Sequence, residues 1–159
     1  MNKRICHNHG NVIDTSDLVV WFGDLNFRLF MDPVVMKTLA NPQNALDKDL
    51  QIGLQQFDQL KRLLQKEFIF PGFKEGAIKF PPTYKYQLGL DIYDIRKQRY
   101  PAFTDRILYK TNAEESPQCI AYNSVQKVRI SDHRPVYALL SVKLKPGIYM
   151  YVLSTFRKN

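Results

Sequence analysis

The sequence predicts an α/β fold with a mixed sheet, one main helix and long loops that carry the polar candidate residues. Three observations support this prediction. A short apolar run at 18–22 is typical of a strand, apolar residues recur at helical spacing over 44–65, and a loop-rich stretch at 69–105 precedes three further apolar segments. The chain of 159 residues is long enough for one domain with a hydrophobic core.

The first two elements are predicted from apolar spacing. Residues 18–22 read Leu-Val-Val-Trp-Phe and end at Gly23 and Asp24, so we expect a strand that is buried on both faces. From about Asn44 to Gln65, apolar residues alternate with charges and glutamines as in an amphipathic helix. The residues of this face are Leu46, Leu50, Leu54, Phe57, Leu60 and Leu64. Gly53 lies inside the pattern and weakens it.

The remaining elements follow from turn residues and further apolar runs. Proline and glycine interrupt the aromatic and basic stretch at 69–105, which we interpret as ordered loops with a short strand near 78–80. Strands are predicted over 106–109, 119–125 and 136–144. We therefore divide the chain into a mobile N-terminal segment (1–17), a domain segment (18–145) and a C-terminal extension (146–159).

Composition limits the partners and the compartment. The net charge of +8 favours anionic partners, which include nucleic acid, lipid headgroups and phosphorylated small molecules. A basic surface that only keeps the protein soluble explains the charge equally well. No apolar run has the ~20 residues of a membrane-spanning helix. Two cysteines, Cys6 and Cys119, form no disulfide framework, so we expect a reducing, cytoplasmic setting.

Several phosphate chemistries are excluded by missing motifs. The sequence has no P-loop, no Gly-x-Ser-x-Gly elbow, and no arginine six residues after either cysteine. It therefore does not indicate a covalent phospho-enzyme. One cysteine and two histidines lie close together at 6–9, but they are too few for a typical zinc site, and we interpret them as part of a mobile terminus.

Three segments carry candidate site residues. In Gly-Asp-Leu-Asn-Phe-Arg at 23–28, Asp24 and Asn26 would point to the same side of a strand and could orient a water and hold a phosphate oxygen. In Ser-Asp-His-Arg-Pro-Val at 131–136, a histidine beside Asp132 could bind phosphate, approach a metal or transfer a proton. In Pro-Ala-Phe-Thr-Asp-Arg-Ile-Leu at 101–108, Asp105 could orient that histidine.

Each segment also has a structural interpretation. Asp24 could form an Asx turn that ends the strand, and on these residues alone we favour this reading. The pair at 132–133 could lie in a solvated loop. Asp105 could form an ordinary ion pair with Arg106 at a strand start.

Taken together and in this order, the three segments resemble the signatures of the inositol-polyphosphate 5-phosphatases. These enzymes belong to the superfamily of DNase I-like endonucleases and exonucleases. Segments 58–60, 72–75 and 82–86 also resemble this family, so the likeness spans about 19–142. It is closest to the branch that acts on membrane phosphoinositides, which includes the 72 kDa type. The resemblance implies the C-terminal half of a DNase I-like α/β sandwich.

The resemblance implies a role for each matching residue. Asp24 would position the attacking water and Asn26 would hold the scissile 5-phosphate. His133 would donate to that phosphate, Asp105 would orient His133, and Asp132 would lie near a magnesium shell. Phosphoryl transfer needs such positioning and charge neutralisation more than covalent help.

A second set of residues matches the positions that grip the neighbouring 4-phosphate. These are Tyr84, Lys85, Lys97 and Arg99. A phenol and several cations suit a dianionic group, and a nuclease would not need them. The alternative for Lys97 and Arg99 is a solvated basic run.

The sequence also departs from the family. The family's Mg²⁺-binding glutamate and its second histidine motif have no counterpart here, so we expect an incomplete and inactive half-domain that lacks its own N-terminal half. The function implied for the parent domain is hydrolysis of the 5-phosphate of phosphoinositides or soluble inositol phosphates, with Mg²⁺ as cofactor. Two alternatives stay open: a metal-dependent nuclease of the same superfamily and a non-catalytic phosphoinositide-binding remnant. We expect no nucleic acid partner, and membrane contact would be peripheral.

Overall fold

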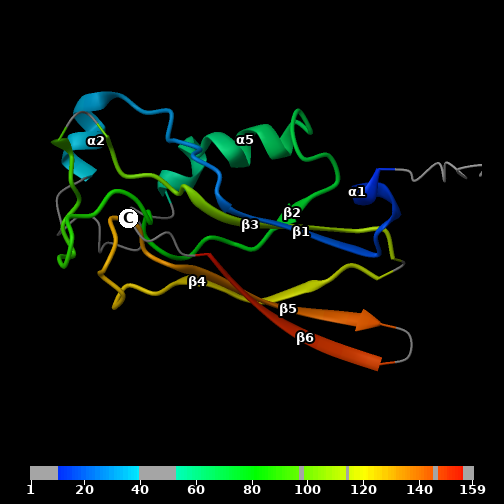
Figure 1. Ribbon diagram of the computed structural model, residues 1–159. Coiled ribbons are helices and arrows are strands. Elements are labelled where there is room, and N and C mark those ends of the chain that lie inside the picture. Colours follow the sequence, from blue (N-terminus) through cyan, green and yellow to red (C-terminus); the bar gives the residue numbers. More distant parts are fainter. Residues whose placement is uncertain (1–10, 40–52, 97–98, 114, 145–146, 156–159) are drawn as a thin grey trace, which may run out of the picture.

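The described strands form two three-stranded antiparallel sheets. The computed structural model describes residues 11–39, 53–96, 99–113, 115–144 and 147–155. One sheet has the strand order β1-β3-β2 and the other β4-β5-β6. In Figure 1 the two sheets lie as two layers, with α5 on the outer side of the first. Buried residues of both sheets, including Ile107 and Leu140, share one hydrophobic core.

The helices and strands follow one another along the chain with the following bounds. They are α1 (Val12–Thr15), β1 (Leu18–Asp24), α2 (Pro33–Leu39), the 3-10 turn η1 (Gln55–Phe57), α5 (Gln59–Gln65), β2 (Lys74–Glu75), β3 (Asp105–Thr111), β4 (Gln118–Ser124), β5 (Val136–Leu144) and β6 (Gly147–Thr155). In the first sheet, Asp24 at the end of β1 lies opposite Asp105 at the start of β3. Two of the predicted site segments therefore meet at one end of this sheet.

Most predicted strands are present. The apolar runs at 18–22, 106–109 and 136–144 lie in β1, β3 and β5, and the run at 119–125 lies in β4 except for its last residue. Instead of one mixed sheet, the described strands pair antiparallel in two sheets. The strand predicted near 78–80 is wrong: the short strand β2 lies at 74–75, while Ile78 and Phe80 are buried core residues of an irregular segment.

The two ends of the chain are described in part. The described part of the expected N-terminal segment contains α1, which Asn112 contacts through hydrogen bonds from its side-chain amide to the carbonyls of Ile13, Asp14 and Ser16. The expected C-terminal extension contains β6, which pairs with β5 along its whole length. Within the described residues, no helix is long and apolar enough to cross a membrane.

The helix predicted over 44–65 is interrupted at Asp58. Residues 44–52 lie outside the described part, and beyond them η1 ends and α5 begins at Asp58, whose backbone is extended (φ −67°, ψ 122°). Its carboxylate accepts a hydrogen bond from the backbone N–H of Lys61 at 3.0 Å and so caps α5. The continuous helix is therefore wrong, because Asp58 serves as a cap and as an ion-pair partner inside the core.

That partner is Arg106, which is fully buried between two carboxylates. Its guanidinium donates to both oxygens of Asp58 at 2.9 and 2.8 Å and to both oxygens of Glu75 at 2.7 and 2.6 Å. Burial disfavours the charge, but the two carboxylates outweigh it and raise the pKa of Arg106 above its ordinary value. Tyr122 donates to Glu75 at 2.8 Å, and burial raises the pKa of this phenol. The cluster joins α5, β2, β3 and β4.

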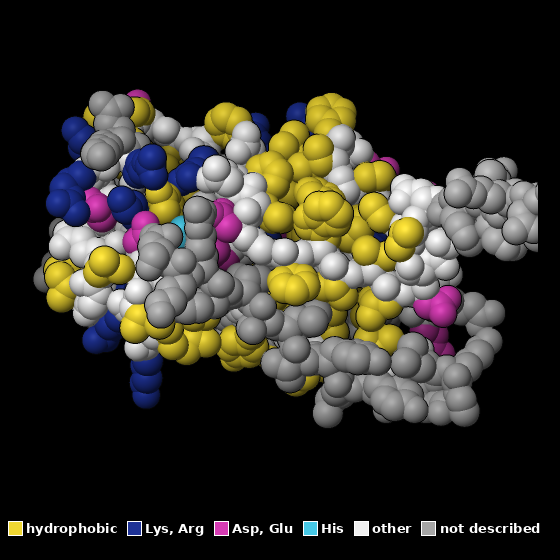
Figure 2. Space-filling model, viewed as in Figure 1, with side chains coloured by type: hydrophobic (Ala, Val, Ile, Leu, Met, Phe, Trp, Pro, Cys, Tyr) yellow, Lys and Arg dark blue, Asp and Glu magenta, His cyan; other side chains and the backbone are white. Residues whose placement is uncertain are grey.

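Strand β1 is less covered than the sequence predicts. The side chains of Trp21 and Phe22 are 46% and 48% exposed, so the expectation of a strand buried on both faces is wrong for the described residues. Trp21 packs against Phe70, which in turn packs against Phe73, with ring centroids 5.7 Å apart in each pair. Figure 2 shows hydrophobic side chains gathered over this layer. These contacts cover β1 only in part.

The buried cluster yields a stability prediction. We expect Asp58→Asn to lower the free energy of unfolding of the intact protein by about 3 kcal/mol, because Arg106 would keep its charge in the core with one carboxylate fewer. The measurement is chemical denaturation followed by circular dichroism. Asp14→Asn is the matched control, since Asp14 pairs with Lys110 at the surface, and it should change stability little. Equal losses in the two variants would contradict this account.

Candidate active site

The segment after β1 turns sharply and places two polar side chains at the end of the first sheet. Asp24 is the last residue of β1, and its Oδ1 accepts a hydrogen bond from the backbone N–H of Asn26 at 3.0 Å. Asn26 has a left-handed backbone (φ 59°), which asparagine tolerates better than most residues. This contact is the Asx turn that the sequence allowed. The turn leaves Asn26 exposed beside the strand end.

At the start of β3, the buried carboxylate of Asp105 accepts several hydrogen bonds. Thr83 and Thr104 donate their hydroxyls to Oδ2 at 2.6 and 3.0 Å. His133 places Nδ1 2.9 Å from the same oxygen. Because an ionised carboxylate only accepts, Nδ1 carries the hydrogen of this contact. The second ring nitrogen of His133, Nε2, is therefore the one that can serve a ligand.

The segment that carries His133 is fixed by buried contacts. Its backbone N–H donates to Ser131 Oγ at 3.1 Å, and the N–H of Arg134 donates to the Thr83 carbonyl at 2.9 Å. Ser131, His133 and Arg134 are buried, so the reading of 132–133 as a solvated loop is wrong. Asp132 Oδ1 lies 4.0 Å from His133 Nε2.

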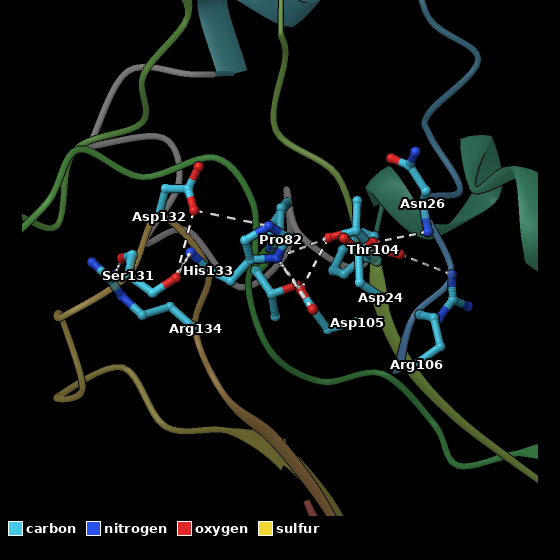
Figure 3. A network of polar contacts seen from close by, with 12 residues as sticks. Asp24, Asn26, Pro82, Thr104, Asp105, Arg106, Ser131, Asp132, His133 and Arg134 are labelled. Atoms are coloured by element: carbon cyan, nitrogen blue, oxygen red, sulfur yellow. Dashed lines mark hydrogen bonds and ion pairs between the residues drawn. The ribbon is translucent and has the colours of Figure 1, made fainter. Parts of the chain in front are cut away.

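The three predicted segments therefore converge on one place. Figure 3 shows Asp24 and Asn26 from the end of β1, Asp105 from β3, and Asp132 and His133 from the loop before β5, arranged side by side. Asp105 faces His133 and is not the ion-pair partner of Arg106, which binds Asp58 and Glu75. The five residues are thus linked as neighbours, since Asp24 lies opposite Asp105 and Asp105 contacts His133. Their shared site and their catalytic roles remain predictions.

Tyr84 connects this group to two arginines. It is buried, and its ring lies 4.7 Å from the His133 ring. Its hydroxyl accepts a hydrogen bond from Arg99 at 3.2 Å, and this bond raises the pKa of Arg99 above its ordinary value. The guanidinium of Arg28 lies over the Tyr84 ring at 4.7 Å and hydrogen-bonds Asn26 Oδ1. Two of the expected 4-phosphate residues thus touch each other beside the histidine.

Lys85, the next residue after Tyr84, lines a cavity of about 370 Å³. Its ammonium group pairs with Asp94 at 3.4 Å, and Arg96 pairs with the same carboxylate at 2.8 Å. The hydrogen bond from Arg96 holds the pKa of Asp94 well below its ordinary value, so this carboxylate stays ionised. The cavity is lined by Lys85, Tyr86, Gln87, Leu88, Asp94, Arg96 and Asp132. Lys97, the fourth expected residue, lies outside the described residues.

Sequence reasoning missed Arg28 and Thr83. Arg28 is the last residue of the motif at 23–28. Nothing in the sequence indicated its contact with Tyr84, which is 56 positions away in the chain. Thr83 gave no signal except its place in segment 82–86. Its role depends on the approach of that segment to β3, which only the fold provides.

The described residues do not form a metal site by themselves. Among them, no group of three or more His, Cys, Asp or Glu side chains is close enough to hold an ion. Mg²⁺ prefers octahedral oxygen coordination, usually with one or two carboxylates and several waters. Asp24 and Asp132 could each supply an oxygen, but they do not amount to a complete protein ligand set.

Comparison with known proteins agrees with this geometry. The model of the endonuclease/exonuclease/phosphatase family 2 matches residues 1–139. Phosphatidylinositol polyphosphate 5-phosphatase type IV of Mus musculus is 42% identical over 139 residues, which are 87% of this chain and 21% of that protein. The chain therefore spans about a fifth of the length of this curated relative.

Two solved structures resemble the chain. The inositol polyphosphate 5-phosphatase domain of SPsynaptojanin, solved with inositol (1,4)-bisphosphate and a calcium ion, is 37% identical with a TM-score of 0.65, and the match covers 93% of this chain and 38% of that one. The ferrous NO complex of the Cimex lectularius nitrophorin is 36% identical with a TM-score of 0.65, covering 79% and 41%. The expected fold, part of a DNase I-like α/β sandwich, is confirmed.

Proposed function

The chain belongs to the endonuclease/exonuclease/phosphatase family, and within it we propose that the chain contributes to a 5-phosphatase site for phosphoinositides or inositol polyphosphates. Relatives with 5-phosphatase names and a neighbour solved with an inositol bisphosphate support this proposal. The fold alone does not, because a nitrophorin matches the chain with the same TM-score. The proposal therefore depends on the site residues.

The single observation that carries the proposal is the cluster of phosphate-binding groups around Tyr84. On one side of its ring lies His133, oriented by Asp105. Its hydroxyl binds Arg99, and the guanidinium of Arg28 lies over the ring. A nuclease needs the histidine and the carboxylates, but two guanidinium groups on a phenol suit a second phosphate on a small ring.

We assign the following roles to the chain's own residues. Asp24 positions the attacking water, and Asn26 donates its side-chain amide to an oxygen of the scissile phosphate. His133, whose Nδ1–H is held by Asp105, presents Nε2 to that phosphate and donates a hydrogen bond when the ring is protonated. Arg99 and Lys85, with Tyr84, hold the neighbouring 4-phosphate. These groups act by holding and charge neutralisation, without a covalent intermediate.

We propose Mg²⁺ as the cofactor of the whole site. The SPsynaptojanin domain was solved with calcium, which supports a divalent cation but does not specify magnesium. Such an ion would supply charge neutralisation at the phosphate. Since the described residues hold no sufficient group of ligands, its main carboxylate would come from elsewhere in the protein, with Asp132 near its shell. We propose a cytoplasmic location with peripheral membrane contact.

A second candidate is a non-catalytic phosphoinositide-binding unit. The observation that favours it is the same lack of a metal-ligand group among the described residues, beside intact phosphate-binding residues. Both candidates bind a phosphorylated inositol, but only the first hydrolyses it.

The 4-phosphate assignment predicts a selective loss. In the intact protein, Lys85→Ala should reduce kcat/KM for 4,5-bisphosphorylated substrates about 10-fold or more, because a charge-assisted contact would be lost. Substrates without the 4-phosphate should be little affected. Lys74→Ala is the matched control, since its ammonium contacts Ser116 at the surface away from the cavity. Equal losses on both substrates would show that Lys85 is structural and would favour the nuclease alternative.

Because the family's metal-binding glutamate has no counterpart in the sequence, we predict that residues 1–159 alone do not turn over phosphate. Without an anchored cation, the charge of the transition state is not neutralised, and the exposed face of β1 should promote aggregation. The measurement is phosphate release from inositol phosphates with added magnesium, compared with the intact protein at equal concentration. Robust magnesium-dependent release by a monodisperse preparation of 1–159 would contradict the prediction.

A further inference from the structure

The cavity beside Lys85 is lined by two cations and two acids. Lys85 and Arg96 supply the positive charges, and Asp94 and Asp132 supply the negative ones. The proposed function assigns Lys85 to the 4-phosphate, yet its ammonium group already lies 3.4 Å from the carboxylate of Asp94. A phosphate that enters the cavity must therefore compete with Asp94 for Lys85.

The backbone holds Asp94 next to Lys85. The N–H of Asp94 donates to the carbonyl of Lys85 at 2.7 Å, and the following pair, Tyr86 and Tyr93, forms an antiparallel bridge. The hydroxyl of Tyr86 donates to Tyr93 at 2.9 Å, and that of Tyr93 donates to the carbonyl of Pro82 at 2.9 Å. Both tyrosines are buried. Because this base is fixed, the carboxylate of Asp94 stays beside Lys85 and is only 5% exposed.

Arg96 binds both oxygens of the same carboxylate. Its guanidinium donates to Oδ1 and Oδ2 of Asp94 at 2.8 and 3.0 Å, and its backbone N–H donates to Oδ1 at 3.1 Å. A two-pronged guanidinium contact of this kind is stronger than a single ammonium contact. The contact between Lys85 and Asp94 is longer than an ordinary charge-assisted hydrogen bond. Asp94 is therefore held mainly by Arg96, and these hydrogen bonds keep its pKa well below the ordinary value.

The balance of charge in the cavity depends on Arg96. Without it, two acids would face one cation, and the cavity would repel a phosphate. With it, the charge of Asp94 is neutralised, and Lys85 can exchange its long contact for a contact with phosphate. We propose that Arg96 is a positioning residue, which binds Asp94 and so leaves Lys85 available to a phosphate of the substrate. This inference rests on the proposed function for the identity of the substrate.

The test uses variants of the intact protein in two assays. One is hydrolysis of inositol 1,4,5-trisphosphate, and the other is calorimetric binding of inositol 1,4-bisphosphate, which carries a 4-phosphate and no 5-phosphate. Arg96→Ala should raise KM and Kd about 5-fold and change kcat little, because the 4-phosphate is bound but not transferred. The Arg96 side chain is 80% exposed, so the variant should fold normally. Arg62→Ala is the matched control, since Arg62 is an exposed arginine of α5 that does not line the cavity, and it should resemble the wild type.

Two double variants test whether Arg96 acts through Asp94 and Lys85. In Asp94→Asn/Arg96→Ala the competing carboxylate is absent, so KM and Kd should return to within about 2-fold of the wild-type values. Lys85→Ala/Arg96→Ala should bind no more weakly than Lys85→Ala alone. A lack of recovery in the first double variant, or losses that multiply in the second, would overturn the proposal.

The binding assay separates this inference from the proposed function. An intact protein that releases no 5-phosphate, but whose Kd values follow the expected order, would support the role of Arg96 and refute the proposed function. Normal hydrolysis together with wild-type KM and Kd in Arg96→Ala would support the proposed function and refute the role of Arg96. A wild-type protein that does not bind inositol 1,4-bisphosphate would also refute the role of Arg96.

Discussion

The buried carboxylate of Asp105 is the contact on which the candidate site depends. It lies at the first residue of β3, in one sheet, and binds His133 from the loop that leads into β5 of the other sheet. The next residue, Arg106, is held by Asp58 and Glu75 in the core. Successive residues of a strand point to opposite sides, so Asp105 at the start of β3 points to the site and Arg106 points into the core. Stability and chemistry are thus coupled at one point of the backbone.

The scaffold alone does not determine the chemistry. A 5-phosphatase domain and a nitrophorin match this chain with the same TM-score, so similar sheets serve different ligands. What distinguishes a phosphate site is local: His133, Arg28 and Arg99 around one phenol, and Lys85 at the cavity beside Asp132.

The sequence predicted those strands that are marked by a continuous run of apolar residues. Strands β1, β3, β4 and β5 come from apolar runs, and the three motifs indicated where the site residues would meet. The helix over 44–65 failed because Asp58 is fixed by Arg106, a contact 48 positions away that periodicity cannot show. Strand β6 was not predicted, although Ile-Tyr-Met-Tyr-Val-Leu at 148–153 is an apolar run. The role of Thr83 could not be identified, because its hydrogen bond to Asp105 depends on how segment 82–86 approaches β3 in the fold.

The most direct test of the account is a double-mutant cycle on kcat with Asp105→Asn and His133→Ala in the intact protein, assayed for 5-phosphate release. If Asp105 acts by orienting His133, each single variant should lower kcat by about 10²- to 10⁴-fold, and the double variant should be little worse than His133→Ala alone. Losses that multiply would show that the two residues act independently, and would contradict the view that their 2.9 Å contact organises the site.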